Sequence, residues 1–586
     1  MKKHYETHVE DTDKLISVAG PVLDYKSWYE QYRKLMEEQA QRKYGLYTPT
    51  SEGDDDDFPS ISGITARYSA LGLTNEQMAE NPVWKDLTGN GHDLQMKNFA
   101  WKGMSGVGGY EMNFNLWRNN VSGIPDISMS TTTTSVSVSV GNSTYNNNLI
   151  YIHISNWDIN KNHWLKVTST YEDGDLAFIF YNDSNTKKIG LPANGYVNIL
   201  AYPEFKGSYM YISTISNKQG SFTIEQLPLY PGALVFDGVD DYGVCDNFPI
   251  LTKEKGYTVV ALRQWDQDFL NTTLTGGLLS TRNYSTGEGV AFEKIESSNK
   301  GYWNLGAGGI IDFAKSPFTW QTSKQYNNVG ILKGDKNHGK PLCVGCGLSG
   351  GQQCGRFAIW ELVFLDHDAT EEELTKIKDY FVKTYPWLFP DQAWTVVGKT
   401  NEDEDRATIA NITGNGNDLV CLNLGFIEGS GYNEEGEYAG YLVTDGVDDK
   451  ITSSIFEMGN DWTVIGDWEL INTGKKDNAG IVKFNSIVIY NYNPILINIK
   501  NGRNNLIPDQ NTVNAICSDG RIYSKDWKES IYNEETESTS KNLLTIGYSG
   551  NSYTKIAFKN LAIYPTVLSK EDCIKAYNYL QTLKAK

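Results

Sequence analysis

The stretch Gly232-Ala-Leu-Val-Phe-Asp-Gly-Val-Asp-Asp-Tyr242 decides the fold, because the chain contains it twice. The second copy is Gly440-Tyr-Leu-Val-Thr-Asp-Gly-Val-Asp-Asp-Lys450. In the first copy Leu234 and Phe236 alternate with Val235, as in a half-buried strand. The Asp-Gly pair that follows favours a tight turn, since glycine accepts a positive φ and aspartate bonds its own backbone. Each copy therefore predicts a strand, a turn and a second strand.

Two further blocks recur in the same order. Leu87-Thr-Gly-Asn-Gly-His-Asp-Leu94 matches Ile412-Thr-Gly-Asn-Gly-Asn-Asp-Leu419 upstream of the repeated stretch. Arg356-Phe-Ala-Ile-Trp-Glu-Leu-Val-Phe364 matches Lys555-Ile-Ala-Phe-Lys-Asn-Leu-Ala-Ile563 downstream, and each of these reads as a strand followed by a helix. Three blocks in one order indicate two copies of a single fold.

The three blocks resemble the concanavalin A-like lectin/glucanase superfamily in its laminin-G-like branch. The second copy departs from the family pattern at Asn411, where the first has an aspartate, and at Thr444, where the first has a phenylalanine. The resemblance implies a mainly β fold with one two-sheet jelly-roll sandwich per copy. The first copy carries the family residues Trp84, Asp86, Gly89, Asn90, Gly91, His92, Asp93, Phe236, Asp237, Gly238, Asp240, Asp241 and Tyr242.

An insertion separates the blocks of the first copy, because Asn90 and Asp237 lie much further apart than Asn415 and Asp445. Its strict alternation at Thr131–Val140, and further short apolar runs between turn residues, predict a small β-sandwich. We expect a helical anchor with an acidic linker at residues 1–60. A first laminin-G-like sandwich follows in two pieces, 61–115 and 227–390, with the inserted β-sandwich at 116–226 between them. A second laminin-G-like sandwich takes up residues 391–586.

The N-terminal segment has a character of its own. Leu23 to Arg42 has aromatic residues at helical spacing, and the four consecutive aspartates at 54–57 favour an extended linker. The helix could pack on the first sandwich or attach the protein to a larger assembly. Both interpretations stay open.

Composition narrows the function classes. The formal net charge is -20, and no cluster of Lys and Arg is visible, which argues against binding to a nucleic acid backbone. No apolar run approaches the ~18 residues of a membrane span, and the start of the chain has no apolar signal segment, so we expect synthesis in a reducing cytoplasm. The seven cysteines do not form a disulfide framework. Cys343, Cys346 and Cys354 could be metal ligands or incidental thiols.

Catalytic motifs are missing from the sequence. Glycoside hydrolysis needs two carboxylates ~5–9 Å apart across the sugar. The glucanase branch places them on one strand as Glu-x-Asp-x-x-Glu, and this chain has no such segment. We found no Ser-His-Asp signature, phosphate-binding loop or zinc-protease motif either. The sequence thus predicts that the protein is not an enzyme.

Calcium is the cofactor that the resemblance implies, as a structural ion beside the Asn-Gly turn. Ca²⁺ takes six to eight oxygen ligands. The residues implied are Asp86, Asn90 and Asp93 in the first copy, and Asn411, Asn415 and Asp418 in the second. The alternative is that these side chains only hold the turns through bonds to the backbone.

A ligand cleft is the second candidate site. Asp240 and Asp241, with Asp448 and Asp449 in the second copy, follow the repeated turn and could line it or cap the loop. Carbohydrate binding also uses exposed aromatic rings, for which Trp265 is our candidate. Other tryptophans in a similar setting are Trp303, Trp320, Trp462 and Trp468.

The phrase that joins the insertion to the first sandwich, Gly220–Gly243, resembles structural proteins of tailed phages that infect gut Bacteroidetes, including the crAss-like group. That resemblance implies a virion protein, as a head fibre, tail fibre or capsid decoration. It would be made in the host cytoplasm, form a homo-oligomer, and bind other virion proteins through its N-terminal segment. Its implied task is adhesion to host-surface or mucus glycans. The alternatives are a bacterial glycan-binding protein and a polysaccharide-degrading enzyme.

Overall fold

The computed structural model divides into two units, residues 1–57 and 58–586. The expected anchor helix at Leu23–Arg42 and the acidic run lie outside the described residues. No helix in the described part of the chain is long and apolar enough to span a membrane. The structure describes residues 58–585 apart from the internal segments 112–113, 120–126, 142–147, 154–162, 183–184, 200–204, 206–208, 215–217, 251–256, 271, 282–290, 295–299, 304–309, 313–340, 349–351, 435–437, 472–478, 485–486, 492–494, 500–504, 508–512, 525–526, 532–541 and 549–552.

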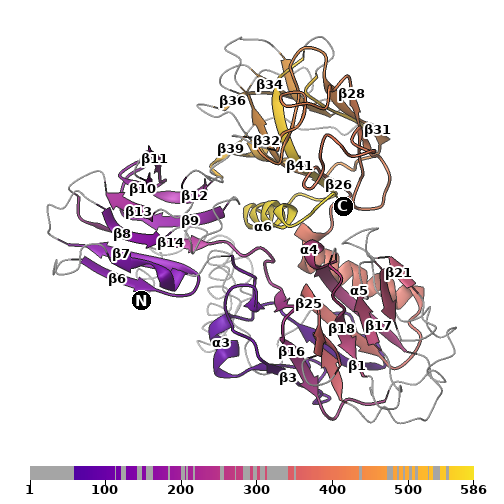
Figure 1. Ribbon diagram of the computed structural model, residues 1–586. Helices are drawn as coiled ribbons and strands as arrows, with labels where there is room; N and C mark the ends of the chain where they lie inside the picture. Colours follow the sequence, from indigo (N-terminus) through magenta and orange to yellow (C-terminus); the bar gives the residue numbers. More distant parts are fainter. Residues whose placement is uncertain are drawn as a thin grey trace, which may run out of the picture. The chain divides into compact units, whose positions relative to one another are not determined.

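The first sandwich consists of two sheets, and the prediction of a mainly β fold is confirmed (Figure 1). The long strand β25 (Arg356–Leu365) is the centre of one sheet. Around it lie β1 (Ile64–Ser69), β4 (Gly106–Val107), β15 (Leu234–Asp237) and β17 (Thr258–Trp265). The other sheet runs through β2 (Val83–Trp84), β3 (Leu94–Lys97), β16 (Tyr242–Cys245), β22 (Leu342–Val344), β18 (Gly276–Ser280), β19 (Ala291–Lys294), β20 (Lys300–Trp303) and β21 (Ile310–Asp312), with β23 (Cys346–Leu348) and β24 (Gln352–Cys354) beside β18.

Over the described residues, the second sandwich repeats the order of the central strands and has three further strands at one edge of its first sheet. Its first sheet is centred on β41 (Ile556–Tyr564), with β26 (Gln392–Thr395), β29 (Gly431–Tyr432), β30 (Leu442–Val443), β32 (Thr463–Leu470), β37 (Val513–Cys517), β38 (Arg521–Ser524) and β39 (Glu529–Ile531). Its other sheet is ordered β27 (Thr408–Ile409), β28 (Leu419–Leu422), β31 (Lys450–Phe456), β40 (Asn542–Ile546), β33 (Ala479–Phe484), β34 (Ile487–Asn491), β35 (Ile495–Ile499) and β36 (Asn505–Ile507).

A third, smaller sandwich lies between β4 and β15 in the sequence. One of its sheets is ordered β11 (Asn185–Gly190), β10 (Leu176–Asn182), β13 (Tyr209–Thr214), β8 (Asn148–His153) and β5 (Arg118–Asn119). The other is ordered β12 (Asn194–Ile199), β9 (His163–Ser169), β14 (Gly220–Gln226), β7 (Ser135–Val140) and β6 (Ile127–Thr131). It has a core of its own, in which Phe178, Phe180, Met210 and Ile212 face Val136, Val138 and Ile224.

The chain enters and leaves this inserted sandwich at neighbouring points. Leu229 N–H donates to the Gly109 carbonyl at 3.0 Å, and Tyr230 N–H donates to the Gly108 carbonyl at 2.8 Å. The insertion therefore closes as a loop on the first sandwich, and its two connections are held together by the backbone.

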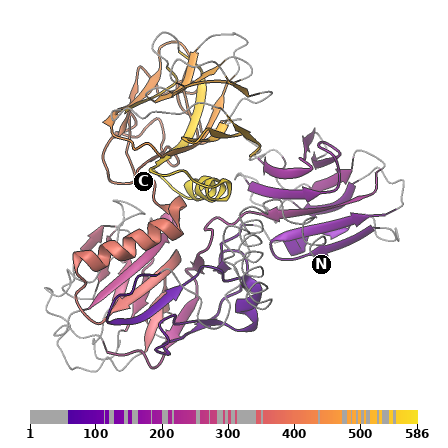
Figure 2. The same cartoon turned by 180° about the vertical axis from the view of Figure 1, so that it is seen from behind.

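Each duplicated sandwich ends in a helix after its central strand. Helix α5 (Glu371–Thr384) is capped by Thr370 and Glu373, which form a capping box, and α6 (Lys570–Gln581) is capped by Ser569. Figures 1 and 2 show α5 lying along the sheet that contains β17 and β25. Its residues Ile377, Tyr380 and Phe381 pack there with Val260 and Val363. Shorter helical pieces are α3 (Asn75–Glu80), α4 (Gln267–Leu270), η2 (Phe114–Leu116) and η7 (Pro386–Leu388).

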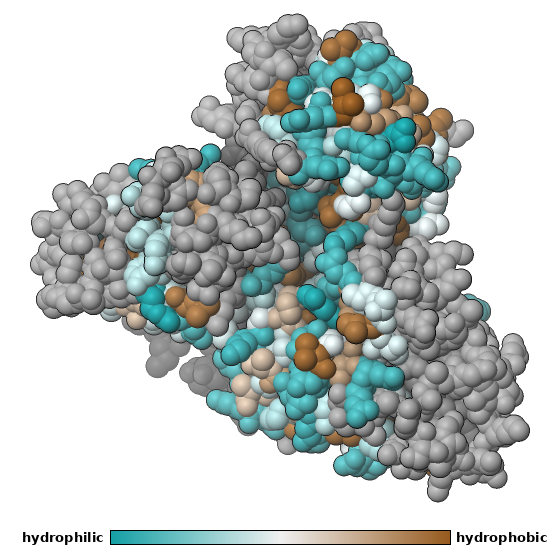
Figure 3. Space-filling view, in the orientation of Figure 1, coloured by the Kyte–Doolittle hydropathy of each residue, from teal (hydrophilic) through white to brown (hydrophobic). Residues whose placement is uncertain are grey.

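The strand that carries the repeated stretch is more buried than the sequence predicts. Leu234, Val235 and Phe236 are all buried, because one face meets the sandwich core and the other is covered as well. The turn after it needs its glycine, since Gly238 and Gly446 both have φ +77°. Val239 and Val447 at the turn tips are 73% and 71% exposed. On the face shown in Figure 3, apolar residues are interspersed with hydrophilic ones over the described surface.

Candidate functional site

Asp86 holds the Asn-Gly turn of the first copy. It lies just after β2, where its Oδ1 accepts hydrogen bonds from Arg67 N–H at 3.1 Å, from Thr88 N–H at 3.0 Å and from the Thr88 hydroxyl at 2.7 Å. Its Oδ2 accepts from His92 N–H at 3.1 Å. The two oxygens together accept from three backbone N–H groups and one hydroxyl. Asp86 therefore ties the turn to strand β1.

The other two residues of this set complete the turn. Asp93 Oδ1 accepts from Asp86 N–H at 2.9 Å, and its Oδ2 lies 2.6 Å from Lys85 Nζ. Burial raises the pKa of Asp93, but its bonds to Lys85 and to the backbone outweigh burial and lower it. Asn90 Nδ2 donates to the carbonyls of Ile64 at 3.3 Å and Thr65 at 3.0 Å.

The second copy builds the same turn around an amide. Asn411 Oδ1 accepts from Ala393 N–H at 3.3 Å and from Thr413 N–H at 3.0 Å. Its Nδ2 donates to the Gly416 carbonyl and to Gln392 Oε1. The remaining two residues behave as in the first copy: Asp418 Oδ1 accepts from Asn411 N–H at 2.9 Å, and Asn415 Nδ2 donates to the Asp391 carbonyl at 2.8 Å.

These contacts do not fit the calcium site that the resemblance implies. A Ca²⁺ ion needs six to eight oxygens directed at one point. Here the carboxylate oxygens of Asp86 and Asp93 face N–H, O–H and ammonium donors, and Asn90 presents its Nδ2 to two carbonyls. In the second copy Asn411 likewise directs its amide nitrogen to acceptors. The turn-holding alternative accounts for every one of these bonds.

Carboxylates gather instead at the repeated Asp-Gly turn. In both copies three of them offer oxygens within 4.8 Å of one another, and they are Asp237, Asp240 and Asp241, and Asp445, Asp448 and Asp449. The third member of each set is fully buried and closes the loop. Asp241 Oδ2 accepts from Asp237 N–H at 3.0 Å and its Oδ1 accepts from the Ser105 hydroxyl at 2.9 Å. Asp449 Oδ2 accepts the matching pair, Asp445 N–H at 2.8 Å and the Ser430 hydroxyl at 2.8 Å.

Burial of these carboxylates changes their acidity. Burial, followed by the nearby charge of Asp237, raises the pKa of Asp241 to about 7. Burial also raises the pKa of Asp449, while its bonds to Ser430 and Asp445 act in the other direction. Asp240 and Asp448 remain exposed beside them. A site with this composition can hold a proton or a small cation, and its buried members already serve the loop.

Trp265 cannot stack on a sugar from the surface, so this part of the sequence interpretation is corrected. It is only 2% exposed, and its ring packs against Phe357 at 5.3 Å between ring centroids, because β17 lies inside the first sandwich. Trp462 and Trp468 are likewise buried in the second sandwich. Trp320 lies outside the described residues, and of Trp303 only the backbone is described.

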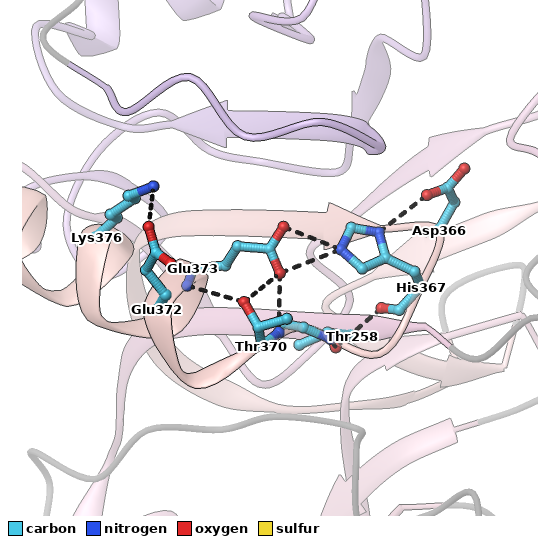
Figure 4. A network of polar contacts seen from close by, with 8 residues as sticks. Thr258, Asp366, His367, Thr370, Glu372, Glu373 and Lys376 are labelled. Atoms are coloured by element: carbon cyan, nitrogen blue, oxygen red, sulfur yellow. Dashed lines mark hydrogen bonds and ion pairs between the residues drawn. The ribbon is translucent and has the colours of Figure 1, made fainter.

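A polar network at the start of α5 went unrecognised in the sequence (Figure 4). His367 Nδ1 lies 3.1 Å from Asp366 Oδ1, and His367 Nε2 lies 3.3 Å from Glu373 Oε1. Burial lowers the pKa of His367, but the bonds to the two carboxylates outweigh burial and raise it. Glu373 also accepts from Thr370 N–H at 2.8 Å, so the histidine is attached to the capping box. The capping box was visible in the sequence, but the histidine contact depends on the loop geometry.

Two of the three clustered cysteines form a disulfide. Cys346 and Cys354 are bonded across the β23–β24 hairpin, and Cys343 beside them is a buried thiol. Burial raises the pKa of the Cys343 thiol to about 12. Neither interpretation drawn from the sequence, metal ligands or incidental thiols, fits Cys346 and Cys354, because their sulfurs are bonded to each other.

Comparison with known proteins gives likeness of fold alone. No protein-family model and no curated protein matches the chain. Among solved structures, the chain is similar to a Trypanosoma rangeli sialidase in complex with the inhibitor DANA, with 9% identity, a TM-score of 0.25, and coverage of 77% of this chain and 83% of that one. It is also similar to the botulinum neurotoxin serotype D binding domain, with 10% identity, a TM-score of 0.23, and coverage of 58% and 88%.

The sialidase matches correct our prediction that the protein is not an enzyme. Sialidases are enzymes, and they align with this chain although it lacks the Glu-x-Asp-x-x-Glu strand. That motif tests for the glucanase branch alone, so its absence does not exclude catalysis. At these identities and TM-scores the alignments assign neither an activity nor a ligand to this chain.

Proposed function

We propose that this chain is an adhesive structural protein of a tailed-phage virion, which displays β-sandwich domains for binding to host-surface or mucus glycans. The observation that carries the proposal is the repeated construction. Two sandwiches share the order of their central strands and the backbone contact at the Asp-Gly turn, and a third sandwich is inserted in the first. Modules with their own cores can be displayed side by side without losing their folds.

The sequence supports the virion assignment through the phrase Gly220–Gly243, which resembles structural proteins of phages that infect gut Bacteroidetes. In this proposal the duplicated sandwiches belong to the concanavalin A-like group in its laminin-G-like branch. The N-terminal segment attaches the protein to other virion proteins, and copies of the chain associate as a homo-oligomer. A net charge of -20 keeps a densely displayed protein soluble.

Particle incorporation tests the virion part of the proposal. Phage particles are purified on a density gradient, and the chain is quantified by mass spectrometry in the particle fraction and in the free fraction. We expect the intact chain in the particle fraction and a chain without residues 1–60 in the free fraction. Recovery of the intact chain from bacterial membranes or culture supernatant, and never from particles, would contradict the virion assignment and favour a bacterial glycan-binding protein.

A further inference from the structure

The inserted sandwich carries a tyrosine-rich outer face that the sequence analysis did not single out. Tyr181 on β10, Tyr209 and Tyr211 on β13, and Tyr151 on β8 lie on the same side of one sheet, because the strand register places them opposite one another. The rings of Tyr151 and Tyr209 are 5.6 Å apart between centroids, those of Tyr151 and Tyr211 are 6.0 Å apart, and those of Tyr209 and Tyr211 are 6.2 Å apart. Tyr181 is 48% exposed and Tyr209 is 41% exposed.

The other sheet of the same sandwich has a different outer face. There the Ser137 and Thr223 hydroxyls hydrogen-bond to each other at 2.9 Å, and Lys166 pairs with Glu225 at 3.6 Å. Small polar and paired charged side chains are what an outer face in water usually presents. The group of neighbouring tyrosine rings thus lies on one sheet, whereas the other outer face has Tyr196 opposite Lys166, and both sheets cover the same core. A contiguous exposed aromatic face marks a binding surface more often than a bare solvent face.

Cations lie at both edges of the tyrosine sheet. By register, one row across the sheet reads Lys188, Ile179, Tyr211, Tyr151 and Arg118. Lys188 is on the edge strand β11 and Arg118 is on the opposite edge strand β5, and both are exposed. With ~4.8 Å between strands, this row spans about 19 Å. Arg118 is held in place at its own edge, where Nη1 donates to the Asn115 carbonyl at 2.9 Å.

This sheet also differs in charge from the rest of the chain. None of the residues in its five strands is Asp or Glu, whereas the whole chain carries 72 acidic and 52 basic residues. A flat aromatic row with a cation at each end complements a ligand that has stacking faces and negative charge. Tyrosine supplies an apolar ring together with a hydroxyl for hydrogen bonds, and lysine and arginine pair with carboxylates or sulfates.

We propose that the tyrosine face of the inserted sandwich, formed by Tyr151, Tyr181, Tyr209 and Tyr211 between Lys188 and Arg118, binds an extended anionic polysaccharide. Sugar rings lie on the tyrosines, and their acidic groups face the two cations. The inference rests on the proposed glycan adhesion and adds where the glycan binds and what charge it carries. It moves recognition away from the two duplicated sandwiches.

Affinity gel electrophoresis of the full chain tests this inference. The probes are polygalacturonate, a chain of uronic acids, and the same polymer after methyl esterification, which removes its charge. We expect polygalacturonate to retard the chain and the esterified polymer to retard it much less. Retardation by polygalacturonate should weaken between about 0.05 M and about 0.5 M salt, because salt screens exposed charges. Equal retardation by both polymers would overturn the anionic part of the inference.

Variants locate the site. The Y151A/Y211A double variant should lose about tenfold or more in affinity, as expected when central aromatic contacts are removed. Y211F keeps the ring and loses only one hydroxyl, so it should keep most of the affinity. K188E should weaken binding several-fold, whereas K187E serves as its matched control. Lys187 lies on the same strand and loses the same charge, but it is paired in register with Phe180, which points into the core.

The outcomes separate this inference from the proposed function. If the full chain binds polygalacturonate and neither Y151A/Y211A nor K188E weakens it, the chain is a glycan binder and the tyrosine face is not its site. If the tyrosine variant changes only the oligomeric state in sedimentation velocity, the face is an interface between copies, and the inference fails. If the chain is absent from particles but still binds through this face, the virion assignment fails and the inference stands. T223A on the opposite sheet is the control for general loss of folding.

Discussion

The two copies of the duplicated sandwich hold the Asn-Gly turn with different side chains, and one of the hydrogen bonds runs in the reverse direction. In the first copy Asp86 only accepts, and its Oδ2 receives the N–H of His92. In the second copy Asn411 keeps the accepting oxygen but donates from Nδ2 to the Gly416 carbonyl and to Gln392. Gln392 occupies the place that Ala66 has in the first copy, as the register of β1 and β26 shows. A change of one residue was thus matched by a change in its neighbour.

The second difference between the copies, Phe236 against Thr444, is also matched by a change in the surrounding contacts. Phe236 stacks on Phe357, with 4.6 Å between ring centroids and an angle of 20° between planes. Thr444 stands in its place and is equally buried, but its hydroxyl donates to the Thr554 carbonyl at 2.7 Å and accepts from Ile556 N–H at 3.0 Å. A buried hydroxyl is tolerated when both of its hydrogen-bonding roles are used. What is retained in both copies is the set of satisfied contacts, and not the residue type.

Truncation of Asp86, which holds the Asn-Gly turn of the first copy, should have the largest effect on stability. D86A leaves three backbone donors and the Thr88 hydroxyl without their acceptor, which should cost about 3 kcal/mol of unfolding free energy. For a domain of this size that corresponds to about 6–12 °C in Tm. Scanning calorimetry of the full chain measures it. The exposed D246A is the matched control and should leave Tm unchanged. A shift in D86A no larger than in D246A would contradict the turn's structural role.

Exchanging Asp86 and Asn411 between the copies should have the next largest effect on stability. D86N turns an amide N–H toward the N–H of His92, and N411D turns a carboxylate toward the Gly416 carbonyl and Gln392. Each change should cost about 2 kcal/mol, because it leaves buried polar groups facing like partners. Combining N411D with Q392A imitates the first copy, so the double variant should be more stable than N411D alone. Calorimetric Tm values of the three variants check this, and additive losses in the double variant would refute the compensation by Gln392.

The stability of the first sandwich should depend on pH through the buried Asp241. The pKa of Asp241, about 7, lies above its value in the unfolded chain. Its contribution is therefore fully present below about pH 4 and is lost as pH rises toward and through pH 7. D241N stays neutral, so it should reduce the loss of stability of the first sandwich between pH 4 and 7. Denaturant titrations across this range test it, with the exposed D246N as the control, because the charge of Asp240 itself helps to raise the pKa of Asp241. An unchanged slope in D241N would count against a raised pKa.

The smallest expected effect concerns the histidine at α5. The residue that corresponds to His367 in the second copy is Thr566. The Thr258 hydroxyl donates to the His367 carbonyl at 3.1 Å, and in the same way the Thr463 hydroxyl donates to the Thr566 carbonyl at 2.9 Å. The raised pKa of His367 means that its stabilisation is present at acidic pH and lost as pH rises through that pKa. H367T should cost about 0.5 kcal/mol at pH 5 and almost nothing at pH 8, since the ion pair is partly exposed. Equal losses at both pH values would argue against an ion pair.

The sequence predicts the mainly β fold well and the sites poorly, for different physical reasons. Repeated blocks such as Asp237-Gly238 and Asp445-Gly446 report local turn geometry, which is read directly from residue type. The roles of Asp86 and Trp265 depend on burial and on partners far along the chain, and no local pattern reports these. The tyrosine face was hidden because its members come from three strands and share one surface only once the register is known. The domain boundaries drawn from the sequence stay a prediction.

A crystal structure of the full chain with a bound oligogalacturonate would test most directly whether the inserted sandwich, and not the duplicated sandwiches, binds the glycan. The expected result is sugar density over Tyr151 and Tyr211, with its carboxylates toward Lys188 and Arg118, and unoccupied Asp-Gly turns in both duplicated sandwiches. Sugar density at Asp240 or Asp448, or a bare tyrosine face in crystals where the ligand is bound elsewhere, would contradict this account.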